Sequence, residues 1–474
     1  MPAKFDNSFA RLGPEFGTRQ MPLPLANATL IHLNQALAEA LALPQEAVQQ
    51  MVLGEPLPPG CEPLAMVYAG HQFGGFSPQL GDGRGLLLGE WCTAGNRWDL
   101  HLKGAGRTPY SRFGDGRAVL RSSLREYLGS AAMQGLGIPT TQALALAGSR
   151  QTVMRERAEP GATLLRVTRC HIRFGHFEYF FYQNQQPLLE KLVNYCASRY
   201  LAQGQYSPDD TRANARALLA LATRSTAKLI AHWQATGFAH GVMNTDNMSL
   251  IGETFDFGPY GFLDDFEPGF ICNHSDDQGR YAFDRQAAIG LWNLNALAHS
   301  LSGLIAIDDI KTELAHYQHT LSETYYTLMM GKLGLKAQAN ETQQALLQDL
   351  LTLLAANRTD YTGFFRALSE SAEQARDLIT DRPGALQWLE RYSACCNQAA
   401  VPERETYMRA RNPKFILRNY LAQQAIESAE AGDFSMLEDL FTVLSAPYDE
   451  HPGHSALAKP PAAHQKHLPV SCSS

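Results

Sequence analysis

The sequence has little of what marks a nucleic-acid-binding, secreted or membrane protein. Lysine and arginine form no long runs, and the 474 residues carry a net charge of −7, which gives no electrostatic support for binding nucleic acid. The first residues lack the apolar core of a secretory signal. The most apolar long segment, 290–307, is interrupted by polar side chains, which favours a buried helix over a membrane span. We therefore expect a cytoplasmic protein without a nucleic-acid or membrane partner.

Cysteine chemistry is also sparse. The eight cysteines are scattered, with no C-x-x-C pair and no histidine at the spacing of a zinc ligand. In a cytoplasmic chain such residues are mostly buried apolar side chains or idle thiols. Cys272 and Cys472 are an open case, because the second lies in a proline-containing tail that could reach the first. Two unpaired thiols are the default, and a redox-sensitive pair is a hypothesis that intact masses before and after oxidation would test.

The composition is that of an ordinary globular protein. Apolar residues make up 45% of the chain and charged residues 18%, and the length is sufficient for two lobes. The order of patterns predicts an α+β fold with a strand-rich lobe followed by a helical one. We expect these parts to be an N-terminal extension at 1–60, a strand-rich N-lobe at 61–186, a helical C-lobe at 187–445 and a flexible tail at 446–474.

Local patterns predict the elements within these parts. Two strands are expected at 86–91 and 98–102 around a turn at 94–96, followed by a helix at 119–134 and short strands at 135–147 and 152–157. The extension should be helical near 27–51. In the C-lobe, apolar residues at helical spacing predict helices at 187–202, 208–233, 285–304, 313–330, 343–354, 361–368 and 415–429.

The C-lobe contains a polar octet, HGVMNTDN at 240–247, after an apolar helical segment that should end at Gly237. Asp256 opens an Asp-Phe-Gly run soon afterwards, and segment 248–255 is expected to return as a strand or hairpin that brings Asp256 beside Asn247. An amide oxygen and a carboxylate are hard ligands that suit the Mg²⁺ of a nucleoside triphosphate. Protein kinases place their catalytic loop and Asp-Phe-Gly in this way.

One part of the kinase pattern is missing from the octet. The position that should hold the catalytic aspartate is Val242, and Asp246 is the only carboxylate left in the loop. We therefore predict a protein-kinase-like two-lobed fold whose chemistry need not be that of a kinase.

The N-lobe holds residues suited to phosphate binding. The run GDGRG at 81–85 could bring backbone N–H groups close to phosphates. Glycine-rich runs are more commonly ordinary hairpin turns. No Walker A motif follows this one. Lys103 ends a strand where kinases place a phosphate-contacting lysine, and Glu126 on the next helix could hold it. Each alone is commonly a surface charge, but the ordered set favours a nucleotide site.

Arginines in the later part of the N-lobe could add to that site. Arg166 and Arg173 are seven positions apart, and guanidinium groups bind phosphate oxygens in pairs. Spacing alone favours two surface arginines, and it leaves Arg155, Arg157 and Arg169 equally plausible.

Long stretches then match a known family. They are YAGHQFG at 68–74, QLGDGR at 79–84, LKGAGRTPYSR at 102–112, SSLREY at 122–127, HGVMNTDNMS at 240–249 and NPK at 412–414. In these stretches the chain resembles selenoprotein O. The resemblance implies a kinase-like pseudokinase that binds ATP in a reversed orientation and transfers AMP to Ser, Thr or Tyr hydroxyls of proteins. Bacterial relatives are also associated with UMP transfer from UTP and with Mn²⁺ in place of Mg²⁺.

The resemblance also implies roles for single residues. Asp246 resembles the proton acceptor, Asn247 and Asp256 resemble the metal ligands, and Cys472 stands where some members carry selenocysteine. The positions that resemble the family's nucleotide contacts are Gly81, Gly83, Arg84, Lys103, Asp115, Gly116, Arg166, Arg173 and Asp256.

Two alternatives to nucleotide transfer are open. In the first, Asp246 replaces the missing loop aspartate in ordinary phosphoryl transfer; the valine at 242 speaks against it. In the second, the chain is a nucleotide-binding scaffold without turnover; Asn247 and Asp256 speak against it, because a scaffold has less use for a metal site.

Overall fold

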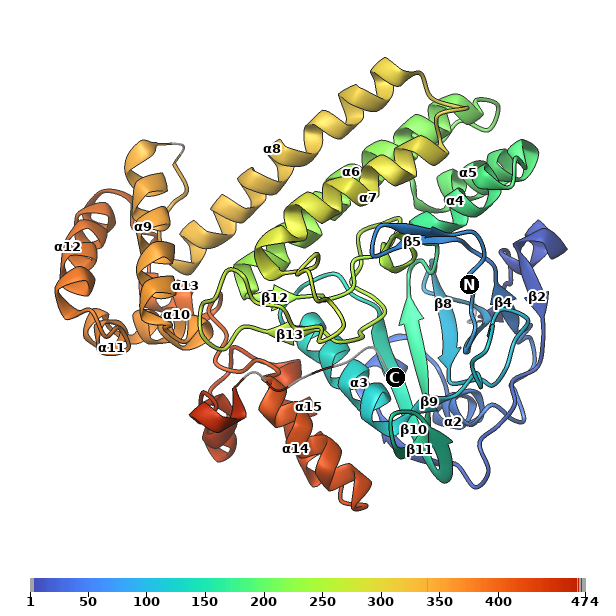
Figure 1. Cartoon of the computed structure of the whole chain (residues 1–474), viewed down its shortest axis with the longest axis horizontal. Helices are drawn as coiled ribbons and strands as arrows, with labels where there is room; N and C mark the ends of the chain where they lie inside the picture. Colours follow the sequence, from blue (N-terminus) through green and yellow to red (C-terminus); the bar gives the residue numbers. More distant parts are fainter. Residues whose placement is uncertain (1–3, 339, 467, 469, 471–474) are drawn as a thin grey trace.

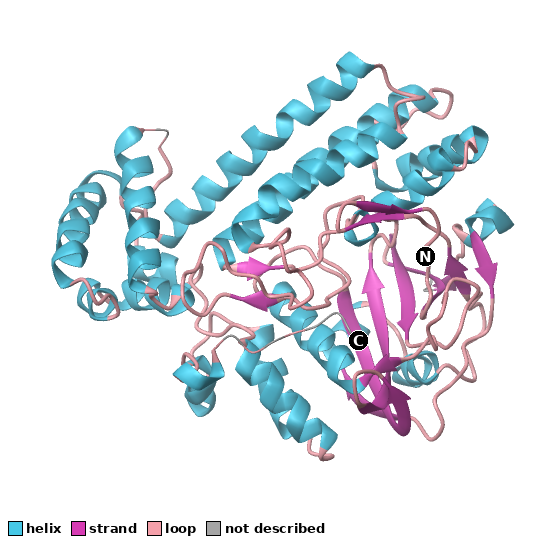
Figure 2. Ribbon diagram, in the orientation of Figure 1, coloured by secondary structure: helices cyan, strands magenta, loops and turns pink. Residues whose placement is uncertain are grey.

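The computed structural model describes residues 4–338, 340–466, 468 and 470. Over these residues the chain forms a half built on a large β-sheet and a half built of helices, as Figures 1 and 2 show. This arrangement confirms the predicted mixed fold and is consistent with the two lobes of a kinase.

The sheet of the first half has nine strands among the described residues, all paired antiparallel. Their order is β2-β4-β7-β8-β11-β10-β3, with β1 on β7 and β9 on β11. The strands are β1 (Lys4–Phe5), β2 (Gly17–Arg19), β3 (Thr29–Leu33), β4 (Leu64–Met66), β7 (Gly85–Thr93), β8 (Asn96–Lys103), β9 (Ala118–Val119), β10 (Gln142–Met154) and β11 (Ala158–Thr168). Strands from the first 60 residues thus join the same sheet as the N-lobe strands.

Helices cover both faces of this sheet. On one face, helices α1 (Gln35–Ala40) and α2 (Gln45–Leu53) share a core with Leu86 and Leu88 of β7. On the other face, α3 (Leu120–Gly135) shares a core with Leu87, which lies between those two leucines in the strand. Successive side chains of a strand point to opposite faces, so β7 is apolar on both sides because both sides are covered.

Some predicted elements of this half are confirmed and some are wrong. The two strands around the turn at 94–96 and the following helix are β7, β8 and α3. Region 27–51 is not simply helical, because 29–33 forms β3 along the edge of β10. The short strands expected at 135–147 and 152–157 are instead the long hairpin of β10 and β11. A short apolar edge strand and a short helix have similar composition, so it is the pairing with β10 that makes residues 29–33 a strand.

The second half contains most of the helices. They are α4 (Phe174–Tyr182), α5 (Gln186–Tyr200), α6 (Thr211–Thr236), α7 (Gln286–Ser300), α8 (Ile307–Lys332), α9 (Glu341–Asn357), α10 (Tyr361–Glu370), α11 (Ala372–Asp377), α12 (Arg382–Ala399), α13 (Arg404–Arg409), α14 (Asn419–Glu430) and α15 (Ser435–Ser445). The helices predicted in the C-lobe are present, and α4, α11, α12, α13 and α15 were not predicted. In Figure 1, α14 and α15 return to α3 of the sheet half, against which both pack.

Short elements complete the chain. They are the strand pairs β5 (Gly70–Gln72) with β6 (Gly75–Ser77) and β12 (Phe238–Ala239) with β13 (Gly261–Phe262), and the 3₁₀ turns η1 (Ala10–Leu12), η2 (Pro14–Phe16), η3 (Thr245–Asn247), η4 (Phe283–Arg285), η5 (Pro452–Ala458) and η6 (Ala463–Gln465). In the part of the chain that the structure describes, no helix combines the length and apolarity that crossing a membrane would require.

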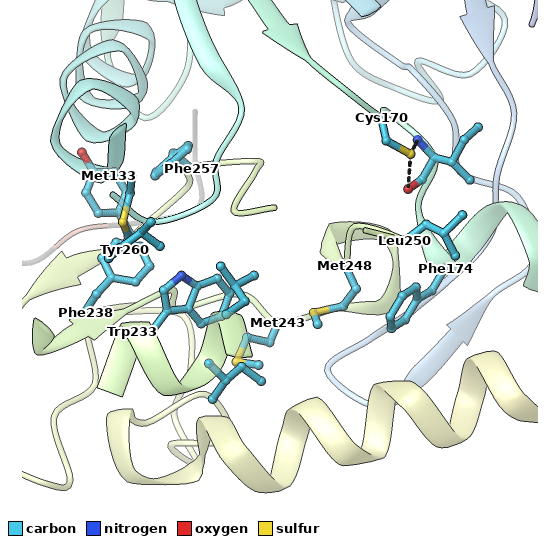
Figure 3. Close-up of a cluster of buried hydrophobic side chains, with 14 of the residues drawn as sticks. Met133, Cys170, Phe174, Trp233, Phe238, Met243, Met248, Leu250, Phe257 and Tyr260 are labelled. Carbon is cyan, nitrogen blue, oxygen red and sulfur yellow. Dashed lines mark hydrogen bonds between the residues drawn. The ribbon is translucent and has the colours of Figure 1, made fainter. Parts of the chain in front are cut away.

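Two methionines in and next to the polar octet anchor it in the hydrophobic core (Figure 3). Met243 and Met248 are both buried in the main core, which they share with Trp233 of α6 and Phe174 of α4. The indole Nε1 of Trp233 donates to Thr254 Oγ1 at 3.0 Å. α6 ends at Thr236, with Gly237 in a left-handed conformation at φ 73°, as the sequence predicts. The loop is therefore a rigid connection between packed elements.

The proposed cysteine pair cannot be placed in the structure. Cys272 is buried, and its Sγ lies 3.5 Å from the carbonyl oxygen of Ala239. Cys472 lies outside the described residues. The redox pair therefore stays a prediction.

Candidate active site

A pocket of about 770 Å³ is lined by residues of both halves of the molecule. This volume falls in the range of small-molecule binding sites. The pocket brings together all the residues expected to bind the nucleotide or the metal or to accept the proton, namely Gly81, Gly83, Arg84, Lys103, Asp115, Gly116, Arg166, Arg173, Asp246, Asn247 and Asp256. Their individual roles stay predictions, but their convergence from distant parts of the chain supports a single site.

A buried ion-pair cluster connects three elements at the back of the pocket. Lys103 Nζ at the end of β8 lies 2.7 Å from Glu126 Oε2 on α3. Arg166 on β11 reaches the same carboxylate through Nε, 2.5 Å from Oε1. The two cations are neighbours because β8 and β11 pair with Leu164 opposite Lys103. Glu126 therefore orients two buried cations at once.

Burial sets the charge state of this cluster. Desolvation lowers the pKa of Lys103 to about 8, and the positive charges of Arg84 and Arg166 act in the same direction, against the opposing effect of Glu126. Burial disfavours ionisation of Glu126 as well, but Arg166 and Lys103 hold its pKa below the usual value. The cluster carries more cations than carboxylates, and such an excess suits a polyanionic ligand.

Asp256 lies between two arginines. Arg166 Nη1 is 3.0 Å from Asp256 Oδ1, and Arg173 Nη1 pairs with Oδ2. Burial alone would raise the pKa of Asp256, but Arg173 and Arg166 hold it far below its usual value. Its backbone has a φ of +57°, which is uncommon outside glycine. The two arginines therefore favour the ionised form of Asp256, which lies in a left-handed backbone conformation.

Asp246 has a different environment in the same pocket. Its Oδ2 accepts a hydrogen bond from Gln72 Nε2 at 3.1 Å, while its Oδ1 is buried and has no hydrogen-bond partner among the described residues. Burial raises the pKa of Asp246 to about 6, and Gln72 and Arg173 only partly oppose this. A Cβ at Gly70 would lie 2.6 Å from Oδ1, so glycine is required there. Asp246 lines the pocket, and a carboxylate with an unpaired oxygen suits the role of a general base.

Asn247 lies beside Asp246 and is fixed by the octet itself. Its Nδ2 donates to the carbonyl oxygen of Val242 at 2.9 Å. Segment 248–255, which follows it, is not the expected strand or hairpin; it is irregular, with single bridges from Ser249 to Arg173 and from Thr254 to Thr140. These non-local bridges position Asp256, and a sequence pattern cannot reveal them.

The two glycine-rich loops form the wall of the pocket on the sheet side. Gly81 has a φ of +124°, and a Cβ there would lie 2.7 Å from the ring of Tyr110. A Cβ at Gly116 would lie 2.1 Å from the carbonyl carbon of Gly106. Close packing of one loop on its neighbours thus requires these glycines. Asp115 in the second loop is held by Arg155 at 2.9 and 3.0 Å.

The structure also separates the arginines that spacing could not. Arg155 lines the pocket, together with Arg166 and Arg173. Arg157 instead forms an exposed pair with Glu430, and Arg169 lies over the ring of Trp98 at 5.3 Å. Neither of these two lines the pocket.

Sequence reasoning missed some residues of the site. Gln72 holds Asp246, and Phe73 lines the pocket beside it. His101 was not missed: the sequence places it near the site, with a structural role as the default, and it lines the pocket. Its Nε2 lies 3.3 Å from Asp82, and its ring stacks on that of His171 at 4.6 Å. Gln72 and Phe73 lie in the stretch at 68–74 that resembles selenoprotein O, and this resemblance is the one feature of the sequence that could have pointed to them.

The residues fit a divalent metal ion by the chemistry of their donors. Asn247 and Asp256 offer amide and carboxylate oxygens, and Asp256 keeps 22% of its side chain exposed at the pocket. No group of three or more His, Cys, Asp or Glu side chains at metal-binding distance occurs in the described part of the chain. Hard oxygen donors such as those of Asn247 and Asp256 are the kind that Mg²⁺ and Mn²⁺ prefer.

Comparisons with known proteins place the chain in a family. The family model described as "Protein adenylyltransferase SelO" matches residues 1–445. Proteins named "Protein nucleotidyltransferase YdiU" from Vibrio cholerae and from Vibrio vulnificus are 51% and 50% identical, over 98% and 99% of both chains. The protein of that name from Myxococcus xanthus is 49% identical over 99% of both chains. The chain therefore belongs to the SelO family of protein adenylyltransferases.

Proposed function

We propose that this protein nucleotidyltransferase transfers AMP from ATP to Ser, Thr or Tyr hydroxyls of other proteins and releases pyrophosphate. UTP is the alternative nucleotide donor, in which case UMP is transferred. One observation carries the proposal: Lys103, Arg166 and Arg173 line the same pocket as Asp246, whose Oδ1 has no hydrogen-bond partner among the described residues. A triphosphate lying between them would place its outer phosphates on the cations and its inner phosphate beside Asp246.

The cation cluster supports the reversed orientation. Lys103 and Arg166 are buried and jointly held by Glu126, and Arg173 lies between Asp246 and Asp256. These groups would bind the β- and γ-phosphates and stabilise the charge that develops on the leaving pyrophosphate. As the phosphates bind, their oxygens would take over guanidinium contacts that Asp256 now accepts.

The acceptor side follows from Asp246. A substrate hydroxyl that approaches the α-phosphorus would give its proton to the free Oδ1, while the oxygen forms the new P–O bond and pyrophosphate departs. General base catalysis of this kind typically contributes about 10²–10⁴-fold in rate. Gln72, on the other oxygen, would keep the carboxylate oriented.

Asn247 and Asp256 would hold a Mg²⁺ or Mn²⁺ ion. The ion, when bound, would neutralise part of the charge on the phosphates. Asn247 is prepared for this because its amide nitrogen is already bonded to Val242, which leaves the amide oxygen as the ligand.

Isotopic labelling tests the proposal. The protein is incubated with Mg²⁺ or Mn²⁺, an acceptor protein such as casein, and ATP or UTP labelled at the α- or the γ-phosphate. We expect label in protein only from the α-position. Label only from the γ-position would indicate phosphoryl transfer, and no label from either would indicate a nucleotide-binding scaffold; both results contradict the proposal.

A further inference from the structure

The turn at Phe73 combines backbone strain with exposure. β5 and β6 pair with Gln72 opposite Gly75, so Phe73 and Gly74 form a two-residue turn, with φ values of 51° and 86°. Positive φ suits glycine but is a strained conformation for a bulky side chain, and such turns favour Asn, Asp or Gly. Phe73 is also 45% exposed. Neither the turn nor the core therefore explains a phenylalanine at this position.

Contacts with the octet hold this turn in place. The backbone N–H of Phe73 donates to Asn244 Oδ1 at 3.2 Å and to Tyr281 Oη at 3.0 Å. The ring of Phe73 packs at 5.2 Å from that of Tyr281, and His71 N–H donates to Thr245 Oγ1 at 2.7 Å. Strain that the surroundings enforce in this way is typical of functional positions.

The turn continues into an exposed aromatic surface. Beside Phe73, three more aromatic side chains around the hairpin are at least 36% exposed, namely Phe76, Tyr182 and Trp292. The ring of His71 connects them, 5.0 Å from Phe76 and 5.3 Å from Trp292. We call Phe73, Phe76, Tyr182 and Trp292 the aromatic rim. Single exposed aromatics are ordinary, but a contiguous group indicates an interaction surface.

The aromatic rim adjoins the acceptor side of the pocket. Gln72 and Phe73 line the pocket together with Asp246, and Gln72 is bonded to it. The loop of Asp115 and Gly116 belongs instead to the sheet half and is held by Arg155. In Figure 1, β5 lies where the sheet half meets the helical half. A hydroxyl that reaches Asp246 must bring the neighbouring residues of its own chain past the hairpin.

We propose that the aromatic rim is the docking surface for the acceptor protein, and that Phe73 selects an apolar side chain close to the modified hydroxyl. The occupant is an extended segment of protein, because only an extended chain can present a hydroxyl to Asp246 and a neighbouring side chain to the hairpin. This inference rests on the proposed function and names the acceptor chemistry of the same site. Phe73 is a specificity-determining residue in this account.

Synthetic peptides test the proposal. A peptide set with a central Ser, Thr or Tyr varies one flanking position at a time between apolar, acidic, basic and small residues, and labelling from α-labelled ATP is measured. The variant Phe73→Asn removes the ring yet tolerates positive φ, and Phe73→Tyr keeps an aromatic ring. Tyr206→Asn removes another exposed aromatic, from the turn between α5 and α6, where the residue is 36% exposed, and serves as the matched control.

We expect the unsubstituted protein to prefer peptides with an apolar flank. In Phe73→Asn, kcat/KM for those peptides should fall about tenfold, mainly through KM, as for a central aromatic contact of an interface. Peptides with small flanks and the Kd for ATP should be unaffected, and Phe73→Tyr and Tyr206→Asn should behave as the unsubstituted protein.

Other results would overturn the inference. An identical peptide preference in Phe73→Asn would remove Phe73 from acceptor selection, with the proposed function intact. A tenfold weaker Kd for ATP in Phe73→Asn would place the ring against the nucleotide instead. Absence of α-label from every peptide with the unsubstituted protein would overturn the proposed function and this inference together.

Discussion

Two carboxylates of one pocket, Asp246 and Asp256, have opposite surroundings. Asp256 is paired with Arg166 and Arg173, and its pKa lies far below the usual value. Asp246 receives only a neutral hydrogen bond on one side-chain oxygen and none on the other, among the described residues, and burial raises its pKa to about 6. Pairs of carboxylates whose pKa values are separated in this way commonly divide the work of a site between them.

The difference comes from which part of the fold reaches each residue. Asp256 follows an irregular segment that lies against β11 and the start of α4, which bring the two arginines. Asp246 lies on η3 under the β5–β6 hairpin, which brings an amide and a close glycine. We infer that the first environment suits charge binding and the second suits proton transfer. The predictions below separate these two roles.

The largest effect is expected at Asp256. Asp256→Asn replaces the charged proposed metal ligand by a neutral amide, leaves Arg173 without its ion pair and leaves Arg166 paired with Glu126 alone. AMP transfer should therefore fall by at least about 10³-fold. Asp349→Asn alters an exposed carboxylate paired with Arg391 and should change the rate by no more than about twofold. Label transfer and thermal unfolding are measured together. Activity of Asp256→Asn within tenfold of normal, in a folded protein, would exclude Asp256 as an essential group.

Asp246 should give a loss of a different kind. Asp246→Asn keeps the shape and can still accept from Gln72, but it cannot take a proton, so the rate should fall by about 10²–10⁴-fold. Titration with ATP should give an unchanged Kd, because the residue is not expected to contact the outer phosphates. A Kd that weakens as much as the rate falls would instead place Asp246 among the nucleotide-binding groups.

The cation cluster should rank next. Lys103→Ala removes one donor to the leaving group, and the rate should fall by about 10²–10³-fold, the range found for the loss of one preorganised donor. Glu126 keeps its contact with Arg166 in this variant, so the fold should be retained. Lys311→Ala, which removes an exposed lysine from a pair with Asp308, is the control. Near-normal transfer by Lys103→Ala would remove Lys103 from the site.

Gln72 should give the smallest effect and the finest test of the comparison. Gln72→Ala removes one neutral hydrogen bond to Asp246, worth about 0.5–1.5 kcal/mol, so the rate should fall by about two- to tenfold. In the double variant with Asp246→Asn, the two losses should not add, because Gln72 acts through Asp246. Full additivity would mean that Gln72 acts elsewhere.

Much of this site could be predicted because its parts lie in locally recognisable patterns. The turn at 94–96 fixes the hairpin that ends at Lys103, and apolar periodicity places Glu126 within α3. Gly237 ends α6 and starts the octet. Each of these follows from the order of neighbouring residues in the chain.

The rest depends on contacts between distant residues. Arg166 could not be chosen over Arg157 by spacing, because the choice follows from the pairing of β11 with β8. The position of Asp256 follows from bridges made by segment 248–255 to Thr140 and Arg173, where a strand was expected. The sequence cannot show that Gln72 is a partner of Asp246, because the two meet only where the β5–β6 hairpin packs against η3. Such pairings carry no local signature.

The orientation of the nucleotide is the central claim, and a structure of the complex with a non-hydrolysable ATP analogue measures it directly. The account predicts that the α-phosphorus lies closer to the Asp246 carboxylate than the γ-phosphorus does, with the γ-phosphate between Lys103 and Arg166. A γ-phosphorus closest to Asp246, with the base beside the cations, would contradict it.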